Sequence, residues 1–178
     1  MKREVICMES NSGNKECVLD IETNGDPWHG RLCTIAILDV KSQQVTTFYH
    51  DKEEVLLMEF LRFFDRTKYN HMIGYNLSFD VRFIFSRCIK YRLRSHSFFK
   101  ARTTDIMMIL KNLNGGYNFN RPGRLSEWSE LINSSIIKSA PVPILYQEGK
   151  ISEILEYNKR HVKITFELWQ RIRFVLEA

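Results

Sequence analysis

The sequence predicts one mixed α/β domain, because strand-like and helix-like patterns follow one another along a chain of moderate length. Apolar runs of strand length come first, and helical periodicity begins near residue 53. A short apolar run at Met72–Tyr75 then leads directly into another helical segment. The chain of 178 residues can bury a sizeable core but is short for two independent ones. We therefore expect a sheet flanked by helices.

The first predicted strands form a meander. We expect a strand at Cys17–Ile21 and a more buried one at Arg31–Val40, separated by the turn-forming residues Asn24–Pro27. A third strand at Val45–His50 follows a short polar turn, so that it pairs antiparallel with the second. This part of the sheet is an antiparallel three-strand meander.

Helices and at least one further strand follow. The segment Glu53–Phe64 has apolar residues at helical spacings and acidic residues at its start, which predicts a helix that covers the sheet. A strand at Met72–Tyr75 and a helix at Phe79–Lys90 form a βα unit, which adds parallel pairing to the sheet. Additional helices are expected at Thr104–Leu113, at Leu125–Ile132 and from Ile151 to the C-terminus, with an exposed loop at Asn112–Gly123.

The composition is that of an intracellular protein. No apolar run approaches the roughly 20 residues that span a bilayer, and Met1–Glu16 is polar, without the apolar core of a secretion signal. We expect residues 1–16 to be a polar extension, residues 17–178 to be the single domain, and the location to be cytoplasmic, without a membrane partner. The 4 cysteines form no CxxC pair, so neither a disulfide nor a zinc site is expected, and Cys17 and Cys33 are predicted to be buried.

The charge balance is compatible with a polyanionic partner. Lys and Arg number 26 against 21 Asp and Glu, for a net charge of +5. Basic and aromatic residues interleave over residues 90–102, which suits either phosphates and stacked bases or a solvated basic face beside core aromatics. These residues are Lys90, Arg92, Arg94, His96, Lys100 and Arg102, with Tyr91, Phe98 and Phe99. No G-x-G-x-x-G follows a strand, and no organic cofactor is expected.

Two carboxylates mark the end of the first strand. Asp20 and Glu22 are two positions apart, so an extended backbone projects both to the same face. Leu19 and Ile21 alternate with them on the other, buried face. Two like charges held side by side attract a divalent cation, although an exposed acidic strand end is the commoner origin of such a pair.

A third carboxylate opens the helix after the fourth strand. In the segment Gly74–Asp80, Asn76 and Ser78 are candidate N-caps, and Asp80 lies in the first turn, where the helix dipole favours negative charge. That placement alone can explain Asp80. The alternative is that the turn directs Asp80 at the first pair, which supplies ligands for a two-metal phosphodiester site.

The C-terminal helix carries the last candidates. Tyr157 and His161 are four residues apart and so share one helix face. Without context, such a pair is more often an amphipathic edge than a site.

Together, these segments resemble the DEDD superfamily of 3′-to-5′ exonucleases, whose proofreading members include the exonuclease domains of family B DNA polymerases. The motifs are LDIET at Leu19–Thr23, IGYNLSFD at Ile73–Asp80 and EYNKRHVKIT at Glu156–Thr165. The resemblance covers most of the chain and is strongest to the tyrosine-bearing subfamily. It implies a ribonuclease H-like fold and removal of nucleotides from the 3′ end of DNA or RNA. A single strand is the expected substrate on physical grounds, because a terminal base must be separated from its partner to enter the site.

The resemblance also implies residue roles in catalysis. Asp20 and Asp80 would hold two divalent metal ions, Mg²⁺ or Mn²⁺, together with Glu22. His161 would contact the metal on the nucleophile side, and Tyr157 would orient the attacking water.

Substrate contacts are implied for three further residues. Asn76 matches the family asparagine near the substrate strand, and Thr23 with Ile21 would approach the 3′-terminal nucleotide. Asp39 and Asp105 are left outside the site, because Asp39 ends a strand away from the motifs and Asp105 is explained as a cap of the helix expected near Thr104.

His161 departs from the family pattern, which has aspartate four positions after the tyrosine. Imidazole suits Mn²⁺ or Zn²⁺ better than Mg²⁺. His161 therefore either completes the site with an altered metal preference or marks a loss of catalysis. Three hypotheses follow from this: an exonuclease, a catalytically inactive nucleic-acid-binding module of the same fold, and a protein-interaction domain with an incidental basic face.

Overall fold

The computed structural model describes residues 13–113, 123–134 and 140–176. Its strands are β1 (Glu16–Thr23), β2 (Leu32–Asp39), β3 (Val45–Phe48), β4 (His71–Gly74) and β5 (Arg102–Asp105). Its helices are α1 (Glu53–Thr67), α2 (Leu77–Tyr91), α3 (Ile106–Leu113), α4 (Leu125–Leu131), α5 (Val142–Gln147) and α6 (Ile151–Leu176), with a 3₁₀ turn η1 at Phe98–Lys100.

The strands form one mixed sheet in the order β3-β2-β1-β4-β5. β1, β2 and β3 pair antiparallel, whereas β4 pairs parallel with both β1 and β5. This confirms the predicted meander extended by parallel strands.

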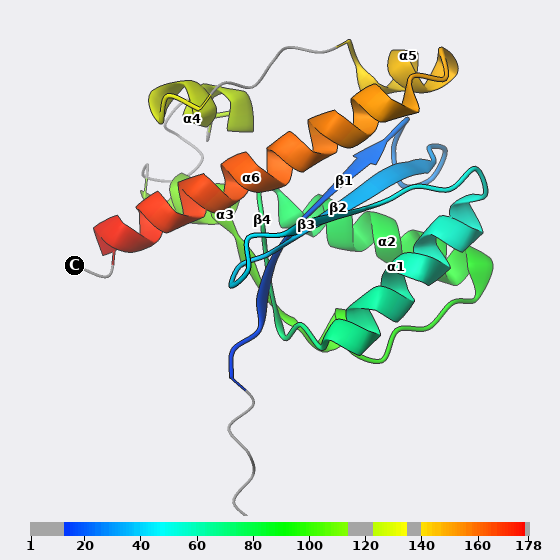
Figure 1. The fold of residues 1–178 in the computed structure, drawn as a ribbon, viewed down its shortest axis with the longest axis horizontal. Helices are drawn as coiled ribbons and strands as arrows, with labels where there is room; N and C mark the ends of the chain where they lie inside the picture. Colours follow the sequence, from blue (N-terminus) through cyan, green and yellow to red (C-terminus); the bar gives the residue numbers. More distant parts are fainter. Residues whose placement is uncertain (1–12, 114–122, 135–139, 177–178) are drawn as a thin grey trace, which may run out of the picture.

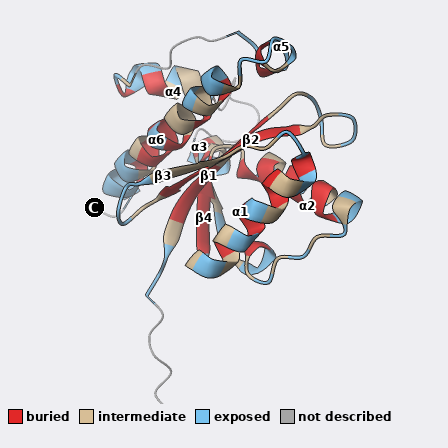
Figure 2. Ribbon diagram, turned by 45° about the vertical axis from the view of Figure 1, so that its right-hand side comes forward, coloured by how far each residue is buried: buried red, intermediate tan, exposed pale blue. Residues whose placement is uncertain are grey.

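Helices cover both faces of the sheet (Figure 1). α1 and α2 pack on one face, where the core includes Leu19 and Ile21 of β1. α6 crosses the other face, where Val18 packs with residues of α3 and α6. Figure 2 shows buried residues along the central strands and exposed ones on the outer sides of the helices. Because side chains alternate along a strand, β1 contributes to both cores.

One predicted helix begins later than expected. Thr104 was assigned to a helix, but Arg102–Asp105 is strand β5, and α3 begins at Ile106. β5 pairs with β4 in a register that joins Gly74 to Asp105. Pairing with the free edge of β4 extends the backbone, so this tertiary contact decides the local structure.

Other expectations are confirmed or stay open. Helix α5 was not predicted, and the loop expected at Asn112–Gly123 lies almost wholly outside the described residues. Residues 1–12 lie outside them as well, so the boundary of the N-terminal extension stays a prediction.

Cys17 and Cys33 are buried, as predicted. Within the described ranges, no helix is both long and apolar enough to cross a membrane.

Candidate functional site

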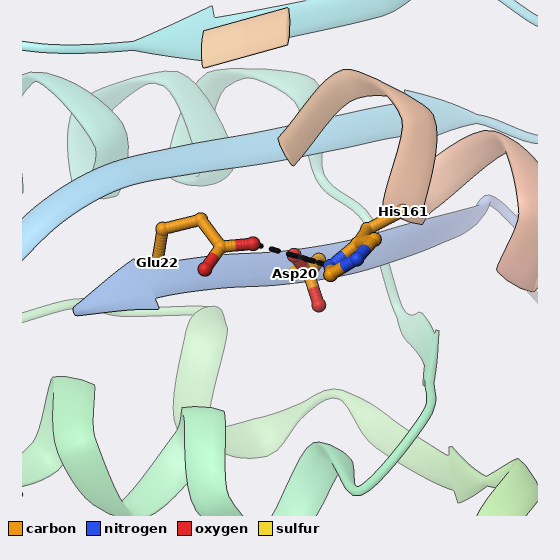
Figure 3. Close-up of side chains that lie close together, drawn as sticks. All are labelled: Asp20, Glu22 and His161. Atoms are coloured by element: carbon orange, nitrogen blue, oxygen red, sulfur yellow. Dashed lines mark ion pairs between the residues drawn. The ribbon is translucent and has the colours of Figure 1, made fainter. Parts of the chain in front are cut away.

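Asp20 and Glu22 of β1 face His161 of α6 (Figure 3). His161 Nδ1 lies 3.4 Å from Asp20 Oδ2 and 3.1 Å from Glu22 Oε1. One candidate ligand atom from each of the three side chains lies within 4.8 Å of the others. The sheet therefore brings together two carboxylates and one imidazole that are about 140 residues apart in sequence.

Asn158 is a part of this cluster that sequence analysis missed. Its Nδ2 donates a hydrogen bond of 2.6 Å to Asp20 Oδ2, and Thr34 Oγ1 of β2 donates one of 3.1 Å to its Oδ1. Asn158 and Thr34 are both fully buried. The signal was present in the sequence, because Asn158 is an amide in helical register with the buried Ile154 and Val162. Asn158 fixes the orientation of the Asp20 carboxylate.

Asp80 approaches the same strand from the other side. β4 pairs with β1 only as far as Val18, so the later amides of that β1 edge have no strand partner there. Asp80, in the first turn of α2, accepts a hydrogen bond of 2.9 Å from the Ile21 amide. The Asp80 carboxylate is thus bound to the backbone midway between Asp20 and Glu22, although it is not a member of the cluster with His161.

Asp105 lies outside the cavity and caps α3, as predicted, but it also holds the turn that precedes Asp80. Its carboxylate accepts hydrogen bonds from the amides of Asn76 at 3.0 Å and Ser78 at 3.2 Å, besides that of Met107 at 3.1 Å in α3. Asn76 occupies the N-cap position in the left-handed region, with φ of 60°, but its side chain makes no capping bond. The carboxylate at the end of β5 therefore replaces the expected side-chain cap.

The side chains of Asp20, Glu22, Asp80 and His161 line one cavity with a volume of about 330 Å³. The Tyr157 and His161 rings form one wall, with centroids 4.1 Å apart. The start of α5 contributes to the rim. Thr23 is not among the lining residues, since it lies at the end of β1 with its hydroxyl bonded to the Gly25 carbonyl. The lining residues are Asp20, Ile21, Glu22, Tyr75, Asn76, Phe79, Asp80, Ala140, Pro141, Val142, Tyr157 and His161.

The electrostatics of the cluster favour a positive charge between the carboxylates. Burial, and less strongly the Asp20 charge, raise the pKa of Glu22 to about 7 against the opposing effect of His161. Burial and the charge of Asp20 also hold the pKa of Asp80 well above its ordinary value. Burial alone would lower the pKa of His161, but its contacts with Asp20 and Glu22 outweigh burial and raise that pKa to about 11. Crowded carboxylates of this kind are stabilised by a cation.

The donor set fits a divalent metal ion. Carboxylate oxygens and an imidazole nitrogen are ligands of Mn²⁺ and Zn²⁺, and the carboxylates alone suit Mg²⁺. Glu22 Oε1 is buried without a well-directed hydrogen bond, although it lies near His161 Nδ1. A buried carboxylate oxygen in that state has capacity for a further ligand.

The basic and aromatic segment 90–102 begins at the C-terminal end of α2, away from the cluster of Asp20, Glu22 and His161. Asp80 is the fourth residue of α2 (Leu77–Tyr91), so the C-terminal end of α2 is about 16 Å from Asp80. Phe98 is fully buried, with ring centroids 5.5 Å from Phe60 and 5.1 Å from Phe64. The interpretation as core aromatics therefore holds for Phe98, whereas Phe99 is 41% exposed.

Comparison with known proteins assigns the chain to a family. The sequence model of the RNase H superfamily matches residues 17–126, and because this match spans more than half of the chain, the chain belongs to that superfamily. It is also similar in structure to the family B DNA polymerase from the hyperthermophilic archaeon Pyrobaculum calidifontis. The TM-score is 0.70 at 14% identity, over 90% of this chain and 24% of the polymerase. The search of curated proteins finds no match.

The structural similarity confirms the predicted fold. At 14% identity it shows the fold alone, and the chain spans about a quarter of the polymerase. Membership in the RNase H superfamily supports a nuclease-type function on a nucleic acid, as predicted in outline.

Proposed function

We propose that this chain is a metal-dependent 3′-to-5′ exonuclease that hydrolyses single-stranded nucleic acid. The observation that carries the proposal is the cavity in which Asp20, Glu22, Asp80 and His161 converge on the end of one strand. Three carboxylates and one imidazole, in a chain of the RNase H superfamily, are a suitable ligand set for divalent metal ions.

Asp20, Glu22, Asp80 and His161 would hold these ions. When bound, two divalent cations would stabilise the charges on the attacking and leaving oxygens of the phosphodiester. The Tyr157 ring lies beside that of His161 at the cavity wall, where the Tyr157 hydroxyl would orient the attacking water. Asn158 positions Asp20 through its hydrogen bond. The imidazole ligand predicts higher activity in Mn²⁺ than in Mg²⁺.

The single strand is the preferred substrate on physical grounds. The cavity has a volume of about 330 Å³ and lies between the end of β1 and α6. A terminal nucleotide must leave its base stack to enter such a space, which costs least for a strand that is already single. Ile21 and Asn76, which line the cavity, and Thr23, just beyond it, are the proposed contacts of that nucleotide.

The test is degradation of a 5′-labelled oligonucleotide, as DNA and RNA in parallel, with Mg²⁺, Mn²⁺ or EDTA. A ladder that shortens from the 3′ end, is strongest in Mn²⁺ and disappears in EDTA and in Asp20→Ala would support the proposal. Glu130→Gln, which changes an exposed carboxylate on α4, is the matched control and should leave the ladder intact. Cleavage at internal phosphodiester bonds, or cleavage that persists in Asp20→Ala, would refute the proposal.

One observation favours a second candidate, a binding module without catalysis. His161 Nδ1 is paired with both Asp20 and Glu22, so the imidazole itself supplies a partner for the crowded carboxylates. The variant His161→Asp separates the two candidates. If His161 is a ligand, His161→Asp shifts the preference from Mn²⁺ toward Mg²⁺; if the wild type is inert and His161→Asp gains cleavage, the binding module is correct.

A further inference from the structure

The loop between β1 and β2 holds an exposed tryptophan in a defined position. Trp28 is 81% exposed. The Asp26 carboxylate accepts hydrogen bonds from the amides of Trp28 at 2.7 Å and His29 at 3.0 Å. The backbones of Gly25 and Gly30 lie so close that a Cβ on Gly30 would be 2.5 Å from the carbonyl carbon of Gly25. The loop is therefore compact, yet its largest apolar side chain lies in solvent.

Two hydrogen bonds fasten this loop to α2, one of them from Arg87, which is also in a buried ion pair with Glu53 of α1. Arg87, with a side chain only 4% exposed, donates a hydrogen bond to the Gly30 carbonyl and lies 3.1 Å from Glu53. The Ser86 hydroxyl lies 3.3 Å from the Pro27 carbonyl oxygen. The backbone of the loop is therefore bonded to α2 at both Pro27 and Gly30.

The loop and α2 enclose a second cavity that adjoins the first. This cavity has a volume of about 610 Å³, and Phe79 lines both cavities. Arg82, Phe85 and Ile89 follow at helical spacing on the exposed side of α2. Phe85 is 53% exposed and Ile89 is 64% exposed, although both are apolar. The surface formed by Trp28, Phe79, Arg82, Phe85, Ile89 and Lys90 is called the Trp28 surface below.

The charges of the Trp28 surface suit an anionic ligand. Arg82 Nε donates to the Ser78 carbonyl, and its guanidinium is exposed beside the apolar side chains. Lys90 Nζ lies 4.9 Å from the centre of the Tyr91 ring and 3.6 Å from Glu53 Oε2, and the Lys90 side chain is 53% exposed. The two acids of this region both have partners: Asp26 accepts from loop amides and lies 3.1 Å from His29 Nδ1, and Glu53 pairs with Arg87 and Lys90. Exposed aromatic rings between cations bind stacked bases and their phosphates.

We propose that the Trp28 surface binds the bases of a single strand upstream of the nucleotide in the catalytic cavity. This inference rests on the proposed function, because Phe79 joins the two cavities. From Phe79 to Ile89 the helix rises about 15 Å, the length of about four stacked nucleotides. Trp28 and Phe85 stack on bases, and Arg82 with Lys90 binds phosphates.

The test is equilibrium binding, measured in EDTA so that cleavage does not interfere. Anisotropy of 5′-labelled oligothymidylates of about three and about eight nucleotides is titrated with wild type, Trp28→Ala, Trp28→Phe and Arg82→Ala. We expect the longer oligonucleotide to bind more tightly to wild type. Trp28→Ala should weaken that binding at least about 5-fold, and Trp28→Phe should restore most of it. Phe174→Ala, which removes another exposed ring, 82% exposed, from the end of α6, is the matched control and should bind as wild type.

The outcomes separate this inference from the proposed function. Unchanged binding by folded Trp28→Ala refutes the Trp28 surface, even if metal-dependent cleavage occurs. If Trp28→Ala loses binding and the wild type binds oligonucleotides without cleaving them, the Trp28 surface is supported and the exonuclease proposal is refuted. If sedimentation shows a wild-type dimer that Trp28→Ala dissociates, and oligonucleotide binding is unchanged, the surface binds a second copy and the inference is wrong. Unfolding curves of all variants verify that each is folded.

Discussion

Removal of the Asn158 amide tests whether the Asp20 carboxylate is held in place by the protein. Asn158→Ala breaks two contacts at once, the 2.6 Å hydrogen bond to Asp20 Oδ2 and the 3.1 Å hydrogen bond from Thr34 Oγ1. His161 Nδ1, 3.4 Å from Asp20 Oδ2, would remain beside Asp20. We expect loss of both stability and activity.

The magnitude follows from the burial of the two partners. Thr34 is 0% exposed, so its hydroxyl loses its acceptor in a place that water does not reach, at a cost of about 1–3 kcal/mol. Asp20 has a side chain 16% exposed, so water replaces part of the lost bond and the charge-assisted contribution falls toward about 1 kcal/mol. The free energy of unfolding should fall by about 2–4 kcal/mol.

Urea unfolding followed by circular dichroism measures this loss. Lys163→Ala, at an exposed position of the same helix, is the control and should stay within about 0.5 kcal/mol of wild type. Adding Thr34→Val to Asn158→Ala removes the orphaned hydroxyl, so the second substitution should cost less than Thr34→Val alone. Calorimetric titration with Mn²⁺ should show weaker binding by Asn158→Ala. Wild-type stability together with wild-type Mn²⁺ affinity in Asn158→Ala would refute the positioning role.

Three further predictions concern the framework. Glu53→Ala leaves Arg87 buried without its carboxylate and should lower the free energy of unfolding by about 3–5 kcal/mol in urea titrations; a loss below about 1 kcal/mol would mean that water solvates the arginine. Gly74→Ala places a Cβ 2.9 Å from a side-chain carbon of Leu77, so thermal unfolding should show a loss of about 1–3 kcal/mol, and an unchanged midpoint would contradict that crowding. Burial raises the pKa of Asp65, but hydrogen bonds from residues 95–97 outweigh burial and hold the pKa below 3.8. The stability from Asp65 is thus present above about pH 4 and lost as pH falls through the lowered pKa, so acid titration of Asp65→Asn should show a shallower loss in that window, and an identical slope would exclude the effect.

Much of the fold could be predicted because its signals are local. Strand β1 and helix α1 are encoded by alternation or helical spacing of apolar residues, and their positions agree with the structure within a few residues. β5 could not be predicted in this way. It has four residues, none fully buried, and its extended conformation depends on pairing with β4, which is about 30 residues away.

The candidate site was predicted in part because some of its signals are also local in the sequence. Asp20 and Glu22 share a face through the period of a strand, and this face meets His161 as expected. The role of Asp105 depends instead on register, because only the pairing of Gly74 with Asp105 brings that carboxylate to the amides at the start of α2. Register between distant strands is not readable from a single sequence.

The end of the pairing between β1 and β4 creates the geometry of the site. If β4 continued beside β1 past Val18, the Ile21 amide would lie next to a strand, and Asp80 could not accept from it. Because β4 ends at Gly74, the chain turns into α2 within a few residues, and Asp80 reaches the open edge of β1. Asp20 and Glu22 meanwhile project toward α6, so carboxylates from two layers surround one short stretch of backbone. A one-residue slip of β1 would exchange Asp20 with Ile21, moving the acids into the apolar core beneath α1 and α2. The packing of Leu19 and Ile21 therefore sets the register that holds the site together.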